Sequence, residues 1–330
     1  MGRTKSRLAA TLTIAAALVV STVPAAQATP STIGDAQLVA IDGTTLAHTI
    51  RYANGDWQRF GHLDVAAVGQ PASVIVNGEE HLFFAQAPTG QGALTHYIRH
   101  ADGTWDVNGS VPEVAPDQIG SISVTSVGGR LVLARLQNWT ALVSTQQADG
   151  TWSTWEKVPF EPEILSLSVT ADGGTLRVVA LTEDSNFVLV ENRSPTGTWS
   201  ASPKKSVQVI GPPIAAINVA AAQVGVDLQV VLRYVFGQDW LWHTILRSDN
   251  TWTSTGDVEY EGGTGRIPSI SSLAVAASTN GSLQVATATE DGAVYHTVRH
   301  ADGTWQPFGD VRSVAGPVST TSITLAADNG

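Results

Sequence analysis

The chain has 330 residues, with 18 Lys or Arg against 29 Asp or Glu, so its formal net charge is −11. A chain this acidic is repelled by the phosphates of nucleic acids and by anionic lipid headgroups, so we expect no nucleic-acid partner. The sequence has no cysteine, which excludes disulfides, thiol catalysis and cysteine-ligated metals.

The first 28 residues have the order of a secretory signal peptide. Three positive charges precede an apolar stretch from Leu8 to Val20, and a small-residue segment, Ala26 to Ala28, follows it. No later stretch approaches the roughly 18 to 20 apolar residues of a spanning helix, so we expect no membrane insertion. The sequence therefore predicts a signal peptide over residues 1–28 and a secreted, extracellular protein over residues 29–330.

A tryptophan recurs along the chain at steps of 48, 47, 47, 53 and 53 residues. The six positions are Trp57, Trp105, Trp152, Trp199, Trp252 and Trp305. Nearly all of them end a segment like His296 to Trp305, HTVRHADGTW. A period of roughly 40 to 50 residues with about four strands per unit is typical of a β-propeller. The predicted fold is therefore all-β, a single six-bladed β-propeller that occupies residues 29–330.

The last unit shows the four expected strands, here called a, b, c and d. They are Ser271–Ala277, Leu283–Thr289, Val294–His300 and Thr304–Phe308. The turns between them carry Asn280-Gly281, Asp291-Gly292 and Asp302-Gly303, pairs in which both residues tolerate positive φ. We expect four-stranded antiparallel blades.

The two ends of the mature chain are expected to share one blade. Gln37–Asp42 matches strand b, whereas Ser319–Ala327 matches strand a with no further strands after it. Pairing of the N- and C-terminal strands would close the ring and remove exposed sheet edges. Helix should be nearly absent, and the alanine-rich segment Ile214–Val226 fits a strand a followed by a turn.

Three residue types in the repeat are candidates for a site. The tryptophan either packs each blade or offers its ring, in a groove between neighbouring blades, to the C–H face of a sugar. Nine residues before it stands His48, His96, Val143, Val190, His243 or His296, and six before it stands Arg51, Arg99, Gln146, Arg193, Leu246 or Arg299. These two positions point to opposite faces of a strand, so His and Arg of one copy are not expected to share a pocket within a blade, although they could meet across neighbouring blades. The alternative is structural: His bonds to a neighbouring strand, and Arg pairs with turn carboxylates such as Asp102 or Asp302.

Catalytic and metal-binding patterns are weak. Glu79-Glu80, Glu161 with Glu163, and Glu259 with Glu261 occur once each, and solvated loop charges explain them. His62 and His81 have no ligand spacing to another His, Asp or Glu. We therefore expect no enzyme, no metal and no cofactor.

The unit from Asp291 to Trp305, DGAVYHTVRHADGTW, resembles the repeat of bacterial propeller lectins in the Photorhabdus lectin-like group. More loosely, it is similar to the six-bladed fungal fucose lectins. The resemblance covers essentially the whole mature chain and implies glycan binding, commonly to fucose or related sugars, between blades without catalysis or metal. It implies sites at Trp57, Trp105, Trp252 and Trp305, with His48, His96, His243, His296, Arg51, Arg99 and Arg299 nearby. Fungal fucose lectins pair the pocket Arg with a Glu, and here only Glu183 and Glu290 precede strand c.

Two other functions stay open. A protein-binding propeller, such as the targeting subunit of a larger secreted antibacterial or toxin assembly, would use irregular loops at Glu156–Ile164 and Gly256–Ile267. A secreted glycoside-cleaving enzyme would need a unique pair of carboxylates converging on one end of the channel.

Overall fold

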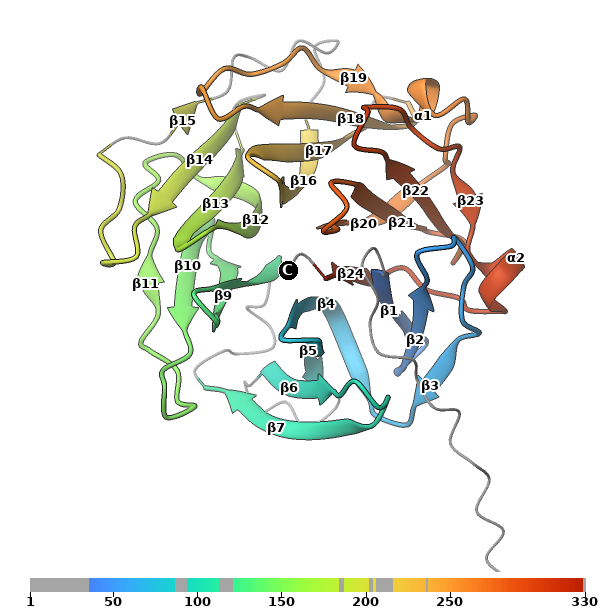
Figure 1. The fold of residues 1–330 in the computed structure, drawn as a ribbon, viewed down its shortest axis with the longest axis horizontal. Helices are drawn as coiled ribbons and strands as arrows, with labels where there is room; N and C mark the ends of the chain where they lie inside the picture. Colours follow the sequence, from blue (N-terminus) through green and yellow to red (C-terminus); the bar gives the residue numbers. More distant parts are fainter. Residues whose placement is uncertain are drawn as a thin grey trace, which may run out of the picture.

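The computed structural model describes residues 36–86, 94–112, 121–183, 187–201, 204–205, 216–235 and 237–328. The expected signal peptide, residues 1–28, lies outside these described residues. The described strands form six four-stranded antiparallel sheets arranged as a ring around a central axis (Figure 1). The predicted all-β, six-bladed propeller is confirmed.

Blade 1 contains both ends of the described chain. Its strands, from the axis outwards, are β24 (Ile323–Ala327), β1 (Ala36–Asp42), β2 (Thr45–Arg51) and β3 (Gly61–Leu63). β1 pairs with β24 in an antiparallel register that runs from Ala36 opposite Ala327 to Ala40 opposite Ile323. The predicted ring closure is therefore confirmed.

The other five blades follow in chain order. Blade 2 has β4 (Ala67–Val76), β5 (Glu79–Gln86), β6 (Leu94–Arg99) and β7 (Trp105–Val111). Blade 3 has β8 (Ile122–Val127), β9 (Arg130–Gln137), β10 (Thr140–Thr145) and β11 (Glu156–Lys157). Blade 4 has β12 (Ile164–Asp172), β13 (Thr175–Thr182), β14 (Val188–Arg193) and β15 (Lys204–Lys205). Blade 5 has β16 (Ala216–Val224), β17 (Asp227–Val235), β18 (Asp239–Leu246) and β19 (Gly256–Asp257), and blade 6 has β20 (Ile270–Ala277), β21 (Leu283–Thr289), β22 (Val294–Arg299) and β23 (Gly309–Asp310).

The hydrophobic core lies between the faces of neighbouring blades. Val179 and Val190 of blade 4, for example, belong to one buried cluster with Val219 and Leu232 of blade 5. Each sheet thus buries apolar side chains against the next sheet, which is the main source of stability in such a ring.

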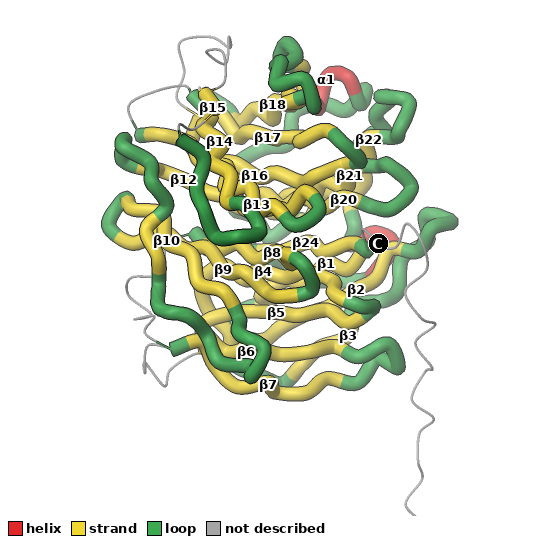
Figure 2. The backbone as a smooth tube through the Cα atoms, turned by 60° about the vertical axis from the view of Figure 1, so that its left-hand side comes forward, coloured by secondary structure: helices red, strands yellow, loops and turns green. Residues whose placement is uncertain are grey.

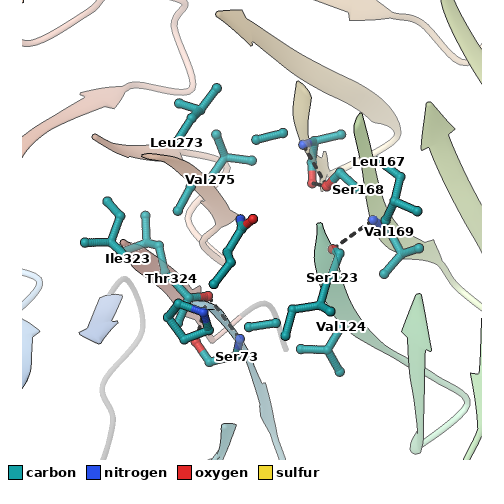
Figure 3. Close-up of a pocket in the computed structure, with 18 of the residues that line it drawn as sticks. Ser73, Ser123, Val124, Leu167, Ser168, Val169, Leu273, Val275, Ile323 and Thr324 are labelled. Atoms are coloured by element: carbon teal, nitrogen blue, oxygen red, sulfur yellow. Dashed lines mark hydrogen bonds between the residues drawn. The ribbon is translucent and has the colours of Figure 1, made fainter. Parts of the chain in front are cut away.

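Hydroxyl groups join the innermost strands around the axis. The backbone N–H of Ser73 donates to Thr324 Oγ1 of the neighbouring blade at 3.0 Å, and the N–H of Val169 donates to Ser123 Oγ at 3.0 Å. Figure 3 shows Ser73, Ser123, Ser168 and Thr324 on these central strands around the narrow channel. These bonds satisfy backbone N–H groups that have no strand partner on the axial side.

The outermost strand differs from the prediction. Thr304–Phe308 was expected to form strand d, but the strand is β23 (Gly309–Asp310), and Trp305 makes only an isolated bridge with Arg299. The Thr297 hydroxyl donates to the Gln306 carbonyl at 2.6 Å, and Pro307 has no N–H for the ladder. The same bond joins Thr49 to Gln58 and Thr244 to Thr253. In these three blades, a threonine eight residues before the tryptophan thus donates its hydroxyl to the outer segment where the regular strand pairing is interrupted.

The turns before the tryptophans also differ in detail. Gly303 has a φ of 90°, whereas Asp302 is not in the left-handed region and accepts a bond from the Thr304 N–H at 2.9 Å. Asn250 replaces the glycine in blade 5 and takes the same conformation, with a φ of 66°. Only the second residue of this turn therefore needs positive φ, which is why Asn can substitute for Gly there.

Two short helices follow the outer strands of blades 5 and 6 (Figure 2). They are α1 (Val258–Glu261) and α2 (Arg312–Ala315). The segments expected as irregular loops, Glu156–Ile164 and Gly256–Ile267, therefore contain β11, β19 and α1. The alanine-rich segment forms β16 as predicted. Among the described residues, no helix is long and apolar enough to cross a membrane.

Candidate functional site

Three half-buried tryptophans lie where neighbouring blades meet. Trp305 of blade 6 contacts His243 of blade 5 edge-on, with ring centroids 5.3 Å apart. Trp57 of blade 1 contacts His296 of blade 6 at 5.1 Å, and Trp105 of blade 2 contacts His48 of blade 1 at 5.5 Å. We call these junctions between blades groove 5/6, groove 6/1 and groove 1/2. They are consecutive around the ring.

The arginine of each groove stands beside the tryptophan. Arg299 is bridged to Trp305, Arg51 to Trp57, and Arg99 is the register partner of Trp105. Directly paired residues of adjacent strands project on the same face, so each Arg and Trp line one groove wall.

The opposite wall of each groove carries the histidine. The positive charge of Arg299 lowers the pKa of His243, and that of Arg51 lowers the pKa of His296, although burial is the larger cause in both. His and Arg therefore come close across neighbouring blades, an arrangement that the strand geometry allowed.

The histidines are buried beneath the tryptophans rather than open to solvent. Burial lowers the pKa of His243 and of His296 to about 3, so both rings are neutral at physiological pH. A glutamine on the neighbouring strand b holds each ring. The Nε2–Oε1 distances are 3.0 Å for His243–Gln229, 2.9 Å for His296–Gln284 and 3.0 Å for His48–Gln37. These histidines therefore have the structural role considered as the alternative, a hydrogen bond to a neighbouring strand, and the partner is a glutamine side chain.

Sequence reasoning did not identify these glutamines. The signal was a glutamine between two apolar residues near the start of strand b, as in Leu283-Gln284-Val285 and Leu228-Gln229-Val230. A polar residue there needs a buried partner, which the histidine supplies.

Groove 1/2 has a buried carboxylate. Glu80 was expected to be a solvated loop charge, but it is 0% exposed, and its Oε2 lies 3.3 Å from His48 Nε2. Its register partner is Arg99, which is 7% exposed. The corresponding strand-b residue of the other blades is apolar: Ala36, Leu131, Leu176, Leu228 and Leu283.

The prediction was also wrong for Glu259. It is buried and accepts bonds from Arg266 Nη1 at 2.6 Å and from the Ile267 N–H at 2.8 Å. Burial raises its pKa, and these bonds oppose the shift. Glu161 and Glu163 are exposed as expected.

His96 lies in a groove without the arginine. It stacks on Phe83 with ring centroids 4.2 Å apart, and its Nε2 is 3.0 Å from His81 Nδ1. Across this groove, Trp152 contacts Phe83, and Gln146 stands where other copies have Arg. The described residues contain no group of three His, Asp or Glu side chains that could hold a metal ion.

Trp252 lies between blades 4 and 5 in an apolar setting. It packs on a cluster that includes Val190 at the histidine position and Leu246 at the arginine position. The structure therefore brings Trp252 near neither residue type of the predicted site.

A further polar set lies between blades 3 and 4, in what we call groove 3/4. Arg193 Nη2 lies 3.0 Å from Glu156 Oε2 of the neighbouring blade, and Trp199 Nε1 donates to Glu156 Oε1 at 2.7 Å. Glu156 stands outside the repeated segment, so no pattern pointed to it.

The two short helices border grooves 5/6 and 6/1. The segment after α1 contacts blade 6, where Thr264 Oγ1 accepts from the Phe308 N–H at 2.7 Å. The Ala315 carbonyl of α2 accepts from the Phe60 N–H of blade 1 at 2.8 Å. Burial lowers the pKa of Arg299, whereas the charges of Glu261 and Asp302 raise it. These two grooves thus combine Trp, Arg, His and Gln with an added outer wall.

No family model matches the chain, and no curated protein matches it. Solved structures do match. The Aleuria aurantia lectin in complex with α-methyl-L-fucoside is 12% identical, with a TM-score of 0.54 over 88% of this chain and 96% of that one. AofleA from Arthrobotrys oligospora is 12% identical, with a TM-score of 0.55 over 91% and 90% of the two chains. The BP39L lectin of Burkholderia pseudomallei is 16% identical, with a TM-score of 0.54 over 86% and 82%. At these identities the likeness establishes a shared six-bladed propeller fold.

Proposed function

We propose that the chain is a secreted, non-catalytic lectin that binds extracellular or cell-surface glycans in grooves between its blades. The signal-peptide pattern of residues 1–28 supports export. The fold shared with known lectins supports carbohydrate binding, although a fold by itself hosts many functions. The proposal therefore rests on the grooves.

One observation carries the proposal: a half-buried tryptophan stands beside an arginine in grooves 5/6, 6/1 and 1/2. The exposed part of such a ring is an apolar platform for the C–H face of a sugar, and the guanidinium offers a fixed fork of donors to hydroxyl oxygens. The His–Gln pair beneath fixes the orientation of the ring. Trp305, Trp57 and Trp105 are thus the proposed stacking residues, with the half-buried Arg299 and Arg51 as donors and the buried Arg99 behind them in groove 1/2.

Fucose and related sugars are the first class to test. The Aleuria aurantia lectin was solved with α-methyl-L-fucoside, and a lectin named SapL1 was solved with α-methyl fucoside. Three consecutive grooves would also let weak sites act together, with a gain of about 10² to 10⁴ in avidity where the geometry allows simultaneous contact.

The test is a glycan array probed with labelled residues 29–330 and with Arg299→Ala and Trp305→Ala variants. We expect binding to a coherent set of sugars that each substitution weakens. Trp139→Ala is the matched control, because Trp139 is 47% exposed in the turn between β9 and β10, outside the three grooves. A blank array, or binding that depends equally on Trp139, would contradict the proposal.

A protein-binding propeller is the second candidate. The observation that favours it is Tyr260 on α1, which is 81% exposed within the Gly256–Ile267 segment. Isolation from the native secretions would then yield a stoichiometric partner that free sugars do not displace and that Tyr260→Ser releases. A glycoside-cleaving activity finds less support, because the unique carboxylates Glu80 and Glu259 are buried against basic partners.

A further inference from the structure

A cavity opens at one end of the central channel, separate from the three grooves. It has a volume of about 640 Å³ and is surrounded by the turns that join the first two strands of blades 2, 3, 4 and 5. The narrow channel segment in Figure 3, of about 80 Å³, is lined by the central strands. Binding sites for small molecules have volumes of roughly 300 to 1,000 Å³, so the wider cavity has the size of a ligand site.

Glycines form much of the lip of this cavity. Gly129, Gly173 and Gly225 have φ values of 76°, 56° and 58°, and a Cβ at any of them would meet nothing within 4 Å. Positive φ explains why glycine is favoured in these turns, but it does not explain why the space beyond each glycine is empty. The lip therefore exposes peptide groups that side chains would cover at other residues.

The wall contains a buried amide with an unused acceptor. Gln223 lines the cavity and is 8% exposed, and its Nε2 donates to the Gly225 carbonyl at 3.1 Å. Its Oε1 is buried without a hydrogen-bond partner among the described residues. This oxygen has almost no accessible surface, so a ligand hydroxyl reaches it only after the Gln223 side chain turns towards the cavity, and that bond would remove the cost of a buried acceptor without a donor.

The remaining chemistry of the wall selects the class of ligand. No Lys, Arg or His lines the cavity among the described residues, so nothing there would hold a phosphate, sulfate or carboxylate. Asn77, Ser126, Asp172 and Asp328 contribute amide, hydroxyl and carboxylate groups. Asp172 is already paired with Arg177, and the described residues contain no three-residue metal-ligand group. The wall therefore suits many neutral hydroxyl groups rather than a charge.

We propose that this axial cavity binds a neutral polyhydroxylated ligand, a sugar or the sugar end of a glycan, with Gln223 as an acceptor for one of its hydroxyls. The site is independent of the grooves, since it shares none of their tryptophans or arginines.

The test is NMR of the protein labelled with [¹⁵N]glycine, titrated with the methyl glycosides of glucose, galactose, mannose, fucose and N-acetylglucosamine. The Gly129 signal is assigned by its loss in Gly129→Asn, a substitution that tolerates positive φ and places a side chain over the cavity. The Gly173 and Gly225 signals are assigned in the same way. We expect saturable shifts of the Gly173 and Gly225 signals with at least one glycoside.

Two variants and one control make the result specific. Gly129→Asn should abolish the shifts, and Gln223→Leu should weaken binding about tenfold, the usual effect of one lost hydrogen bond. Gly237→Asn is the matched control, because Gly237 has a φ of 69° and open space around it, in the turn between β17 and β18 at the opposite end of the blade. Unchanged signals at all cavity glycines, or shifts that persist in both variants, overturn the proposal. Shifts restricted to Gly55 and Gly303, beside the groove tryptophans, would support the grooves and overturn the axial site.

Discussion

Trp305 of blade 6 stands edge-on to His243 of blade 5, with ring centroids 5.3 Å apart and an angle of 81° between the ring planes. Gln229 holds the histidine from the neighbouring strand at 3.0 Å. An edge-to-face pair adds a modest attraction to the area that both rings bury. Trp305 thus packs between two blades, and the proposed function gives the same side chain a second role in sugar binding.

This double role predicts a graded response at Trp305. Trp305→Phe keeps an aromatic face against His243, so we expect weaker glycan binding with nearly unchanged stability. Trp305→Ala should abolish binding in groove 5/6 and lower the free energy of unfolding by about 2 kcal/mol, less than for a fully buried tryptophan. Urea denaturation and titration with the best array sugar measure the two effects. Equal binding by both variants would remove Trp305 from the site.

Acidification should destabilise the ring through its buried histidines. Burial lowers the pKa values of His96, His243 and His296 from 6.5 to about 3. Between these values the unfolded chain binds protons that the folded chain does not, so stability is lost as the pH falls from about 6.5 towards 3. Each histidine contributes a slope of up to about 1.4 kcal/mol per pH unit.

The contribution of one histidine is measured as a difference between variants. His243→Val introduces the residue that blade 3 has at this position, Val143. It should lower the number of protons taken up on unfolding, which is obtained from the slope of the unfolding free energy against pH, by up to one. His62→Asn is the control, because His62 is exposed. Parallel stability curves for the protein and His243→Val between pH 4 and 6 would show that this histidine is not held neutral.

The buried pair in groove 1/2 predicts strong non-additivity. Glu80→Leu removes a carboxylate charge that acts on the buried Arg99, although the charge of Asp102 still acts on it, so we expect a loss of about 1 to 3 kcal/mol. Glu80→Leu with Arg99→Leu reproduces the Leu228–Leu246 pair of blade 5 and should restore most of that loss. A double-mutant cycle in urea measures the coupling. Additive effects would show that the two side chains do not act as a pair.

The repeat predicted the architecture because it is local. The spacing of the tryptophans gave the number of blades, and the unmatched strands at the two ends gave the pairing of β1 with β24. The interruption of the outer strand was missed because it depends on a side chain: the Thr297 hydroxyl donates a hydrogen bond to the Gln306 carbonyl. The alternation of apolar and polar residues, from which the strand was predicted, does not reveal such a hydrogen bond.

Buried polar partners were missed because they come from distant parts of the chain. Glu80 follows a turn and has the sequence appearance of a solvated charge, yet Arg99 and His48 face it from another strand and another blade. The prediction of a site at Trp252 was wrong because its partner residues come from another copy. The repeat of Trp252 contains His243, but Trp252 packs against blade 4, which has Val190 at the histidine position. A site between repeats is set by two copies, so one copy cannot predict it.

The hydroxyl groups around the axis predict that removing one of them destabilises the contact between two neighbouring blades. Ser168 Oγ accepts from the Ala221 N–H at 3.0 Å between blades 4 and 5, where both groups are buried. Ser168→Ala would leave that N–H without an acceptor, so we expect a loss of about 1 to 3 kcal/mol and faster hydrogen exchange at the Ala221 amide. Ser313→Ala is the control, since Ser313 is exposed on α2 and should change stability by less than about 0.5 kcal/mol. Unaltered exchange at Ala221 would mean that the strand packing alone joins these two blades, with the hydroxyl adding nothing measurable.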